Sequence, residues 1–215
     1  MFNKEEVTRK VAEFLLQIKA VKLSLDKPFT WASGIKSPIY CDNRVTLSYP
    51  KTRTYIRQSL AGGIQEIFGN VDAIVGVATG GIAMGALVAE ELGLPFAYVR
   101  AEAKSHGTKK HIDGDLPAGS NVVVIEDLVS TGMSSLKAVR VLRDHDIIVK
   151  GMAAIFTYGF PEADENFKKE KVNLFTLSSY PVLLESAVDG GYVKDKDLDV
   201  LKAWREDPKN WKNDN

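Results

Sequence analysis

The chain has 215 residues, of which 45% are apolar and 26% charged, and its 28 basic side chains balance its 28 acidic ones. This composition is ordinary for a globular domain and argues against a strongly basic nucleic-acid-binding or membrane-surface protein, so any anion must be bound by a local site. Cys41 is the only cysteine, which excludes an intrachain disulfide framework. Because the N-terminus also lacks the apolar core of a signal peptide, we expect a cytoplasmic protein.

The first fifty residues predict a helix followed by a small β-rich piece. Apolar residues recur at helical spacing between residues 6 and 20. The segments that follow, VKLSL, PFTW and SPIYC, have the composition of short strands and are too few to enclose a core of their own. We therefore assign residues 1–50 to an N-terminal helix and a small β-containing hood.

From residue 51 onward, predicted strands alternate with predicted helices. The strands cover residues 72–78, 95–100, 121–127, 147–156 and 172–178, and the helices cover residues 50–68, 81–92 and 132–144. This alternation predicts an α/β core over residues 51–187, with an open, mainly parallel sheet flanked by helices. Residues 188–215 contain a polar turn and a short helix, and we assign them to a C-terminal extension packed on the same domain.

One strand of this core runs directly into paired acids, in the stretch NVVVIEDLVSTGMSS. Glu126 and Asp127 end the strand, and a turn rich in hydroxyl groups, residues 130–135, precedes the next helix. Backbone N–H groups at a helix N-terminus favour a phosphate, and carboxylates accept hydrogen bonds from sugar hydroxyls. The stretch therefore predicts a site for a ribose 5-phosphate at a strand end. A capped helix beside two solvated acids is the alternative interpretation.

A second strand ends in the turn Thr79-Gly80-Gly81, within VGVATGGIAMG. Such a turn before a helix predicts a second backbone site for an anion. It contains neither the P-loop Gly-Lys-Ser/Thr nor a complete GxGxxG, which disfavours a nucleoside-triphosphate or dinucleotide site. Its alternative is a glycine-rich turn that packs a helix on the sheet.

Two other segments carry polar or aromatic groups outside regular elements. About twenty residues, RAEAKSHGTKKHIDGDLPAGS, separate two strands and include Arg100, Lys104 and His106, which predicts a mobile cationic lid or a solvated loop. The segment FTWASGIKSPIYCDNR places Trp31 and Tyr40 among small polar residues. A flat ring could stack there, although the same pattern is typical of a small sheet's core.

Together these motifs resemble those of the type I phosphoribosyltransferases. VVVIEDLVSTGMSS is similar to the family's phosphoribosyl-diphosphate motif, and FTWASGIKSP and YVRAEAKSHGTKKHIDG resemble its orotate-specific members. The resemblance implies a Mg²⁺-dependent homodimer of pyrimidine (UMP) biosynthesis that transfers ribose 5-phosphate from 5-phosphoribosyl 1-diphosphate to orotate, giving orotidine 5′-monophosphate and diphosphate. Another nucleobase as acceptor, or a non-catalytic phosphoribosyl-diphosphate sensor, remains open.

The resemblance also implies roles for individual residues. Lys104, His106 and Asp127 would be catalytic, with the lid acting in trans on the neighbouring subunit, and Ser130 and Tyr40 would contact orotate. Mg²⁺ would be held mainly by the substrate, with Asp127 binding it through water. The residues implied in phosphoribosyl-diphosphate binding are Thr79, Gly80, Gly81, Arg100, Lys104, His106, Glu126, Asp127, Leu128, Val129, Ser130, Thr131, Gly132, Met133 and Ser134. The chain departs from members that carry lysine at three positions, where it has Ala32, Gly80 and Ala101.

Overall fold

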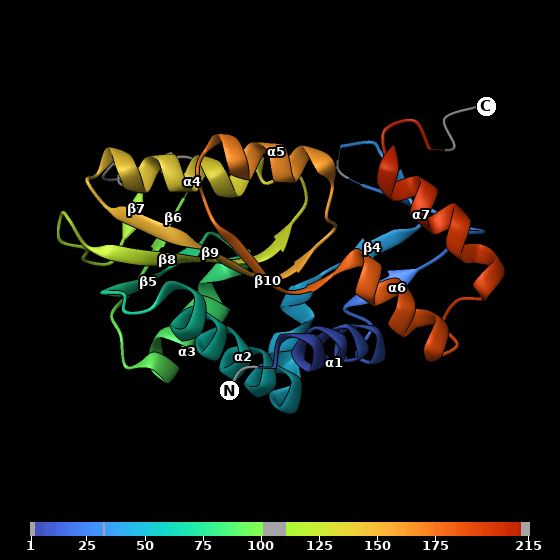
Figure 1. Ribbon diagram of the computed structural model, residues 1–215, viewed down its shortest axis with the longest axis horizontal. Helices are drawn as coiled ribbons and strands as arrows, with labels where there is room; N and C mark the ends of the chain where they lie inside the picture. The colour runs from blue at the N-terminus through green and yellow to red at the C-terminus, as the bar shows by residue number, and fades with distance from the viewer. Residues whose placement is uncertain (1–2, 32, 101–110, 212–215) are drawn as a thin grey trace.

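The computed structural model describes residues 3–31, 33–100 and 111–211. A six-stranded sheet in the order β10-β9-β8-β5-β6-β7 forms its centre (Figure 1). These strands are β5 (Ala73–Val77), β6 (Phe96–Val99), β7 (Ile112–Asp113), β8 (Asn121–Val129), β9 (Ile148–Thr157) and β10 (Leu174–Ser179). All neighbouring strands pair in parallel except β7, which is antiparallel to β6. The predicted α/β fold with an open, mainly parallel sheet is confirmed.

Helices cover both faces of this sheet (Figure 1). One face carries α1 (Lys4–Gln17), α2 (Pro50–Phe68) and α3 (Gly80–Leu92), and the other carries α4 (Met133–Asp144) and α5 (Pro161–Lys169). This double coverage explains why residues 122–125 of β8 are all apolar. Val123 and Ile125 pack into the core beneath α2 and α3, whereas Val122 and Val124 pack beneath α4.

The chain changes direction across the sheet between β5 and β8. After β5 it continues outward through β6 and β7, and β8 then returns to the other side of β5 and leads on to β9 and β10. A crevice opens at such a switch point because the connections after the two strands run to opposite sides. The carboxyl ends of β5 and β8 are therefore the place where a ligand is expected.

Residues 21–48, which we call the hood, lie beside these strand ends. The hood contains two antiparallel pairs and a 3₁₀ helix: β1 (Val21–Leu23) with β4 (Ile39–Cys41), β2 (Phe29–Thr30) with β3 (Lys36–Ser37), and η1 (Asn43–Ser48). These strands are too short to bury an apolar core by themselves. Their core is completed by other parts of the chain.

The C-terminal residues complete the hood. They contain α6 (Tyr180–Asp189), η2 (Asp195–Asp197) and α7 (Leu198–Glu206). Trp204 of α7 is fully buried, and its indole N–H donates to the backbone oxygen of Lys36 at 3.2 Å. Four aromatic rings have their centroids within 5.8 Å of the ring of Trp204, those of Trp31, Tyr158, Phe160 and Tyr180. The last helix thus joins the hood to the ends of β9 and β10.

The α-helices α5 and α6 and the strand β7 were not predicted from the sequence. Helix α5 buries only Ala163 and Phe167 within a strongly charged segment, so its apolar stripe is too narrow to stand out. Helix α6 follows β10 without a connecting loop, and β7 has only two residues. Each lacks either the hydrophobic periodicity or the flanking turn residues on which the prediction of helices and strands depends.

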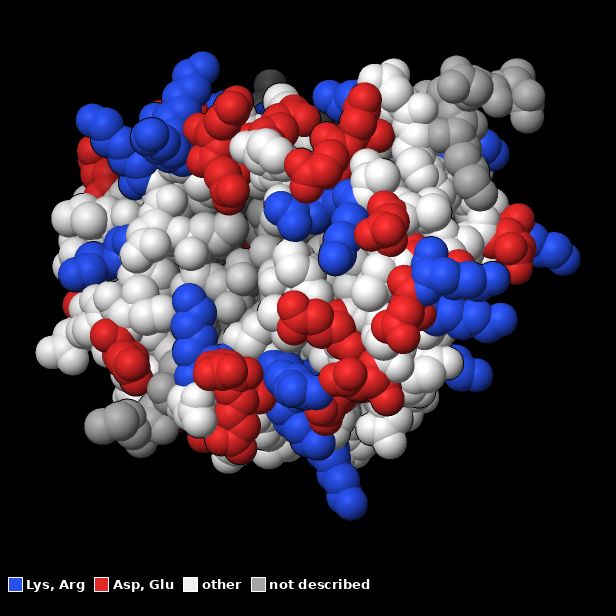
Figure 2. Space-filling view, turned by 45° about the vertical axis from the view of Figure 1, so that its right-hand side comes forward, with Lys and Arg blue, Asp and Glu red and all other residues white. Residues whose placement is uncertain are grey.

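No helix in the described ranges is long and apolar enough to cross a membrane. On the face drawn in Figure 2, the Lys and Arg side chains alternate with Asp and Glu side chains. This mixed surface agrees with the formal net charge of zero. Attraction of an anionic ligand therefore depends on the groups that line its site.

Candidate active site

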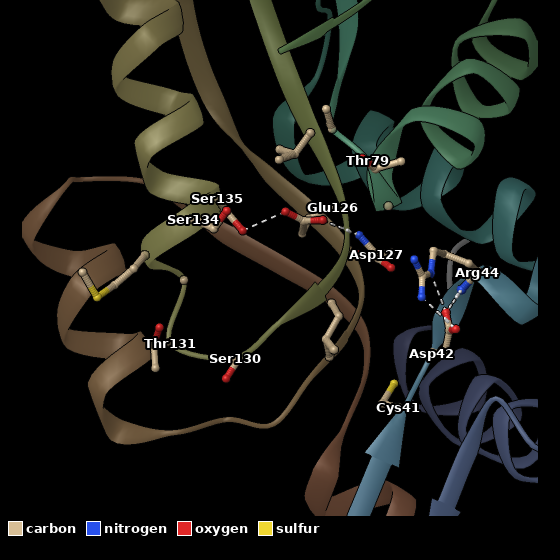
Figure 3. A pocket seen from close by; sticks show the side chains of 16 residues that line it. Cys41, Asp42, Arg44, Thr79, Glu126, Asp127, Ser130, Thr131, Ser134 and Ser135 are labelled. Atoms are coloured by element: carbon tan, nitrogen blue, oxygen red, sulfur yellow. Dashed lines mark hydrogen bonds and ion pairs between the residues drawn. The ribbon is translucent and has the colours of Figure 1, made fainter. Parts of the chain in front are cut away.

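A cavity of about 430 Å³ lies at the carboxyl ends of β5 and β8. Four segments form its wall: the end of β4 and start of η1, the turn after β5, the end of β8, and the turn before α4 (Figure 3). The lining residues are Cys41, Asp42, Arg44, Val77, Ala78, Thr79, Gly80, Glu126, Asp127, Leu128, Ser130, Thr131, Gly132, Met133, Ser134 and Ser135. The two turns and the acidic pair singled out in the sequence thus meet in one cavity.

The acidic pair has an asymmetric environment. Glu126 is buried and accepts hydrogen bonds from the Ser135 hydroxyl at 2.8 Å and from the backbone N–H of Asp127 at 3.0 Å. Burial, with the charge of Asp127 adding to it, raises the pKa of Glu126 well above its usual value. Burial also raises the pKa of Asp127, while hydrogen bonding with Glu126 and the charge of Arg44 oppose that rise. The Glu126 carboxyl is therefore engaged within the protein, which leaves the half-buried Asp127 carboxyl as the one available to a ligand.

The raised pKa of Glu126 predicts a change in how stability depends on pH. Above the ordinary carboxyl value of 4.5, the unfolded chain has lost a proton that the folded chain retains, so the free energy of unfolding falls as pH rises towards the folded pKa. We expect Glu126→Gln to flatten this decline and to raise Tm at pH 8 by a few degrees, roughly 2–4 °C per kcal/mol for a chain of this size. Thermal unfolding between pH 5 and pH 9 measures it. Glu66→Gln, at an exposed position of α2, is the control, and parallel Tm curves for wild type and Glu126→Gln would contradict the prediction.

The turn after β8 has the geometry of an anion site. Gly132 adopts φ 76° immediately before α4, which begins at Met133, so successive backbone N–H groups of the first turn face the cavity. A Cβ at Gly132 would lie 2.4 Å from the ring of Phe167, which makes the position doubly dependent on glycine. The amide of Asn166 donates to the Thr131 oxygen at 2.9 Å and holds the turn against α5.

The glycines of the turn after β5 have two different roles, one at the cavity and one in packing helix α3 on the sheet. Thr79 and Gly80 line the cavity, and a Cβ at Gly80 would lie 2.3 Å from a carboxylate oxygen of Asp127. Gly81 instead packs against β8, where a Cβ would lie 2.2 Å from the Ile125 oxygen. One glycine therefore admits the Asp127 side chain, and the next allows α3 to approach the sheet.

Some predicted residues lie outside the cavity wall. Val129 is buried in the sheet, and Tyr40 is exposed and packs on Phe29 with ring centroids 5.7 Å apart. Arg100, at the end of β6, donates to Asp113 at 3.2 Å. Lys104 and His106 lie outside the described residues.

The hood supplies three lining residues that the sequence analysis missed. Cys41 ends strand β4, and Asp42 and Arg44 follow it, in the motif IYCDNR. Their signal was available, since polar residues directly after a strand are the pattern that identified Glu126 and Asp127. Burial raises the pKa of the Cys41 thiol well above its usual value, so that this cysteine is unsuited to act as a nucleophile.

Residues 50–178 match the family model described as "Phosphoribosyl transferase domain". The chain belongs to the phosphoribosyl transferase family. Among its relatives, the orotate phosphoribosyltransferase of Phocaeicola vulgatus is 58% identical over 93% of this chain and 94% of that protein. The orotate phosphoribosyltransferase of Listeria monocytogenes is 50% identical over 95% of this chain and 98% of that protein.

Solved structures agree with this family assignment. The orotate phosphoribosyltransferase of Aeropyrum pernix superposes with a TM-score of 0.73 at 32% identity, covering 86% of this chain and 99% of that chain. The UMP synthase of Leishmania donovani shares the fold with a TM-score of 0.78 at 24% identity, over 92% of this chain and 42% of that chain. Most of the residues that line the cavity at the ends of β5 and β8 lie within the segment that the family model matches.

Proposed function

We propose that this chain is an orotate phosphoribosyltransferase, which transfers the ribose 5-phosphate of 5-phosphoribosyl 1-diphosphate to orotate and releases diphosphate. The observation that carries the proposal is the identity of 50–58% to proteins of that name over more than nine-tenths of the chain. The cavity supports it independently, because its two turns and acidic pair match the three parts of the donor. A cytoplasmic reaction of pyrimidine biosynthesis follows from this activity and agrees with the free thiol of Cys41.

Each part of the donor has a place in the cavity. The 5-phosphate would bind the turn of residues 130–135 at the start of α4, and the ribose hydroxyls would donate to Asp127. The diphosphate would lie against Thr79 and Gly80. Ser130, the first residue of that turn, also lines the cavity, and we assign it to contact the nucleobase.

The residues of this site promote the transfer by charge and position. The bond between the anomeric carbon and a diphosphate oxygen breaks, its electron pair stays on the diphosphate, and the nitrogen of the orotate anion supplies the pair for the new bond. Asp127 would stabilise the positive charge that develops on the ribose ring, and cations would stabilise the leaving group. We assign Arg100, Lys104 and His106 to the second role, with His106 able to give the diphosphate a proton near neutral pH.

Magnesium fits the donor set of this cavity only as a substrate-borne ion. No group of three or more metal-ligating side chains occurs within the described residues, and Glu126 is already engaged by Ser135. Asp127 is left to hold the metal, through water, beside the diphosphate. When bound, Mg²⁺ supplies positive charge that neutralises the diphosphate.

Release of diphosphate tests the proposed activity. We expect release from phosphoribosyl diphosphate only when orotate and Mg²⁺ are both present, and none with uracil, adenine or hypoxanthine. Release with a purine but not with orotate would refute the substrate and leave the family assignment intact. Binding of phosphoribosyl diphosphate without release in the presence of any of the four bases would indicate a sensor.

We also propose a homodimer in which Lys104 and His106 act on the neighbouring subunit's site. Lys104→Ala and Asp127→Asn should each be nearly inactive alone. Refolded together in equal amounts, about half of the dimers are mixed, and each mixed dimer has one intact and one doubly altered site. We expect about a quarter of wild-type activity to return, measured as diphosphate release. If mixed dimers form and no activity returns, the two residues act within their own subunit.

A further inference from the structure

Arg44 is the only positively charged residue among the described residues that line the cavity. The other ionisable groups of the wall are three carboxyls and one thiol, those of Asp42, Glu126, Asp127 and Cys41. The Arg44 side chain is 59% exposed, although it sits at the rim of a site for a polyanionic substrate. The guanidinium of Arg44 therefore has hydrogen-bonding capacity beyond what the surrounding protein groups use.

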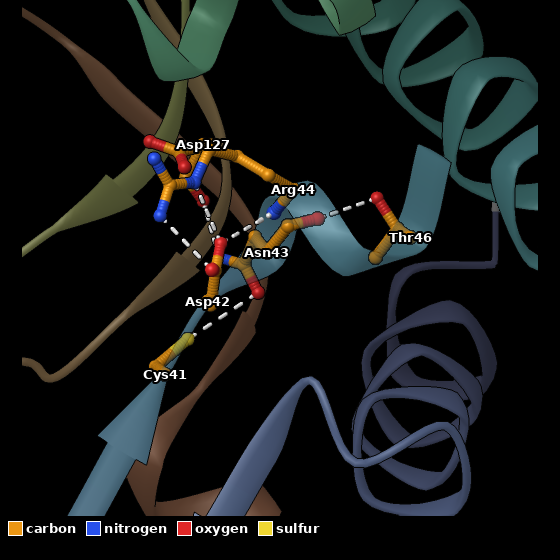
Figure 4. A network of polar contacts seen from close by, with 6 residues as sticks. All are labelled: Cys41, Asp42, Asn43, Arg44, Thr46 and Asp127. Carbon is orange, nitrogen blue, oxygen red and sulfur yellow. Dashed lines mark hydrogen bonds and ion pairs between the residues drawn. The ribbon is translucent and has the colours of Figure 1, made fainter. Parts of the chain in front are cut away.

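The guanidinium of Arg44 is held in one orientation by Asp42. The two side chains form a fork in which Arg44 Nε and Nη2 donate to the two Asp42 oxygens at 2.7 and 2.9 Å (Figure 4). The Arg44 backbone N–H donates to the same carboxylate at 3.1 Å, which fixes Asp42 as well. No described residue accepts a hydrogen bond from Nη1. The fork therefore leaves one end of a pre-oriented donor available to a ligand.

The position of Arg44 relative to Asp127 indicates which part of the substrate it meets. Its guanidinium lies beside Asp127 without a hydrogen bond or ion pair between them (Figures 3 and 4). The Asp127 carboxylate also lies against Gly80, where a Cβ would come within 2.3 Å of one of its oxygens. Arg44 and the Thr79–Gly80 turn thus flank the carboxylate that would hold the ribose hydroxyls. The substituent on the neighbouring anomeric carbon would lie between them.

We propose that Arg44 binds the diphosphate of phosphoribosyl diphosphate and stabilises its negative charge as it leaves the ribose. The inference rests on the donor substrate of the proposed function. Gly80 brings no cation to this group, whereas Arg44 approaches it from the hood. Because the leaving group gains an electron pair as its bond to the anomeric carbon breaks, the contact strengthens in the transition state and contributes to kcat as well as to binding.

The test compares Arg44→Gln and Arg44→Lys with wild type. Its matched control is Arg140→Gln. This change removes another exposed arginine–carboxylate pair, in which Nε and Nη2 of the 56% exposed Arg140 donate to one oxygen of Glu170 at 3.0 and 2.7 Å. Steady-state kinetics give kcat and the KM for each substrate. The affinity for inorganic diphosphate is measured by calorimetry in the presence of Mg²⁺ and, separately, from its inhibition constant as a product.

For Arg44→Gln we expect kcat/KM for phosphoribosyl diphosphate to fall about ten- to a hundredfold, the range of one charge-assisted hydrogen bond. The dissociation constant of inorganic diphosphate should rise about tenfold, and KM for orotate should change less than twofold. Arg44→Lys should recover part of the loss, and Arg140→Gln should match wild type.

Two results would overturn the proposal. A rise in KM for orotate with unchanged diphosphate binding would reassign Arg44 to the carboxylate of the nucleobase, and unchanged constants throughout would reduce it to an ion pair with Asp42. Since diphosphate binding is measured without any nucleobase, it still decides the role of Arg44 if orotate proves not to be the acceptor.

Discussion

Asp127→Asn should lower kcat about a hundredfold or more while leaving the protein folded. The amide has nearly the shape of the carboxylate, and the main chain at this position is held independently, because the Asn43 amide donates to the Asp127 backbone oxygen at 2.6 Å. What disappears is the negative charge that would accept the ribose hydroxyls and oppose the charge developing on the ring. Initial rates of diphosphate release at saturating substrates measure the effect.

Asp144→Asn provides the matched control for this change. Asp144 is exposed at the C-terminal end of α4, whereas the N-terminal end of the same helix lines the cavity. This variant should keep the wild-type kcat. Thermal unfolding of both variants separates loss of chemistry from loss of structure. If folded Asp127→Asn protein keeps the wild-type kcat, the charge of the Asp127 carboxylate has no role in catalysis.

Trp204→Ala should lower the free energy of unfolding by about 3–5 kcal/mol, the cost of removing a large buried aromatic side chain. Trp204 is fully buried and contacts Trp31 of the hood, with ring centroids 5.7 Å apart. Loss of its indole N–H would also leave the backbone oxygen of Lys36 without this hydrogen-bond donor. Urea denaturation gives the value.

Two further variants show which property of the Trp204 side chain causes the loss of stability and provide a control. Trp204→Phe keeps a ring but loses the N–H, and we expect a loss of about half that of the alanine variant. Tyr192→Ala removes an exposed aromatic side chain from the same C-terminal region and should be nearly neutral. A loss of less than about 1 kcal/mol for Trp204→Ala would mean that α7 docks only weakly on the hood.

The core of the site could be predicted because its signals are local. Glu126 and Asp127 directly follow four branched apolar residues, and residues 130–135 directly precede a helix, so strand end, acids and phosphate turn are read from one continuous stretch. The meeting of this stretch with Thr79 and Gly80 also follows, because parallel strands present their carboxyl ends at one edge.

The remaining wall of the cavity depends on contacts between distant parts of the chain. Asp42 and Arg44 meet Asp127 only because the hood folds over β8, with Asn43 bridging the two at a sequence separation of 84 residues. Their position after a strand marks both residues as candidates for a site, but nothing in the sequence records which distant strand end they meet. Tyr40 illustrates the converse, since alternation along β4 decides that its neighbour Cys41 lines the cavity while the tyrosine ring points to Phe29.

Because Trp204 packs on Trp31, the core of the hood cannot form during synthesis until residue 204 has been made. At about 5–20 residues per second, the roughly 170 residues between these two tryptophans take about 10–35 s to synthesise. During that time the hood has no final core, even though the strands and turns that line the cavity have already been synthesised. A chain released after residue 179 but before residue 204 would therefore carry every strand of the sheet and both turns of the cavity, but its hood would lack the ring that completes its aromatic core. A truncation between residues 180 and 203, far from the cavity in sequence, would yield molecules whose defect lies in the hood that borders the cavity.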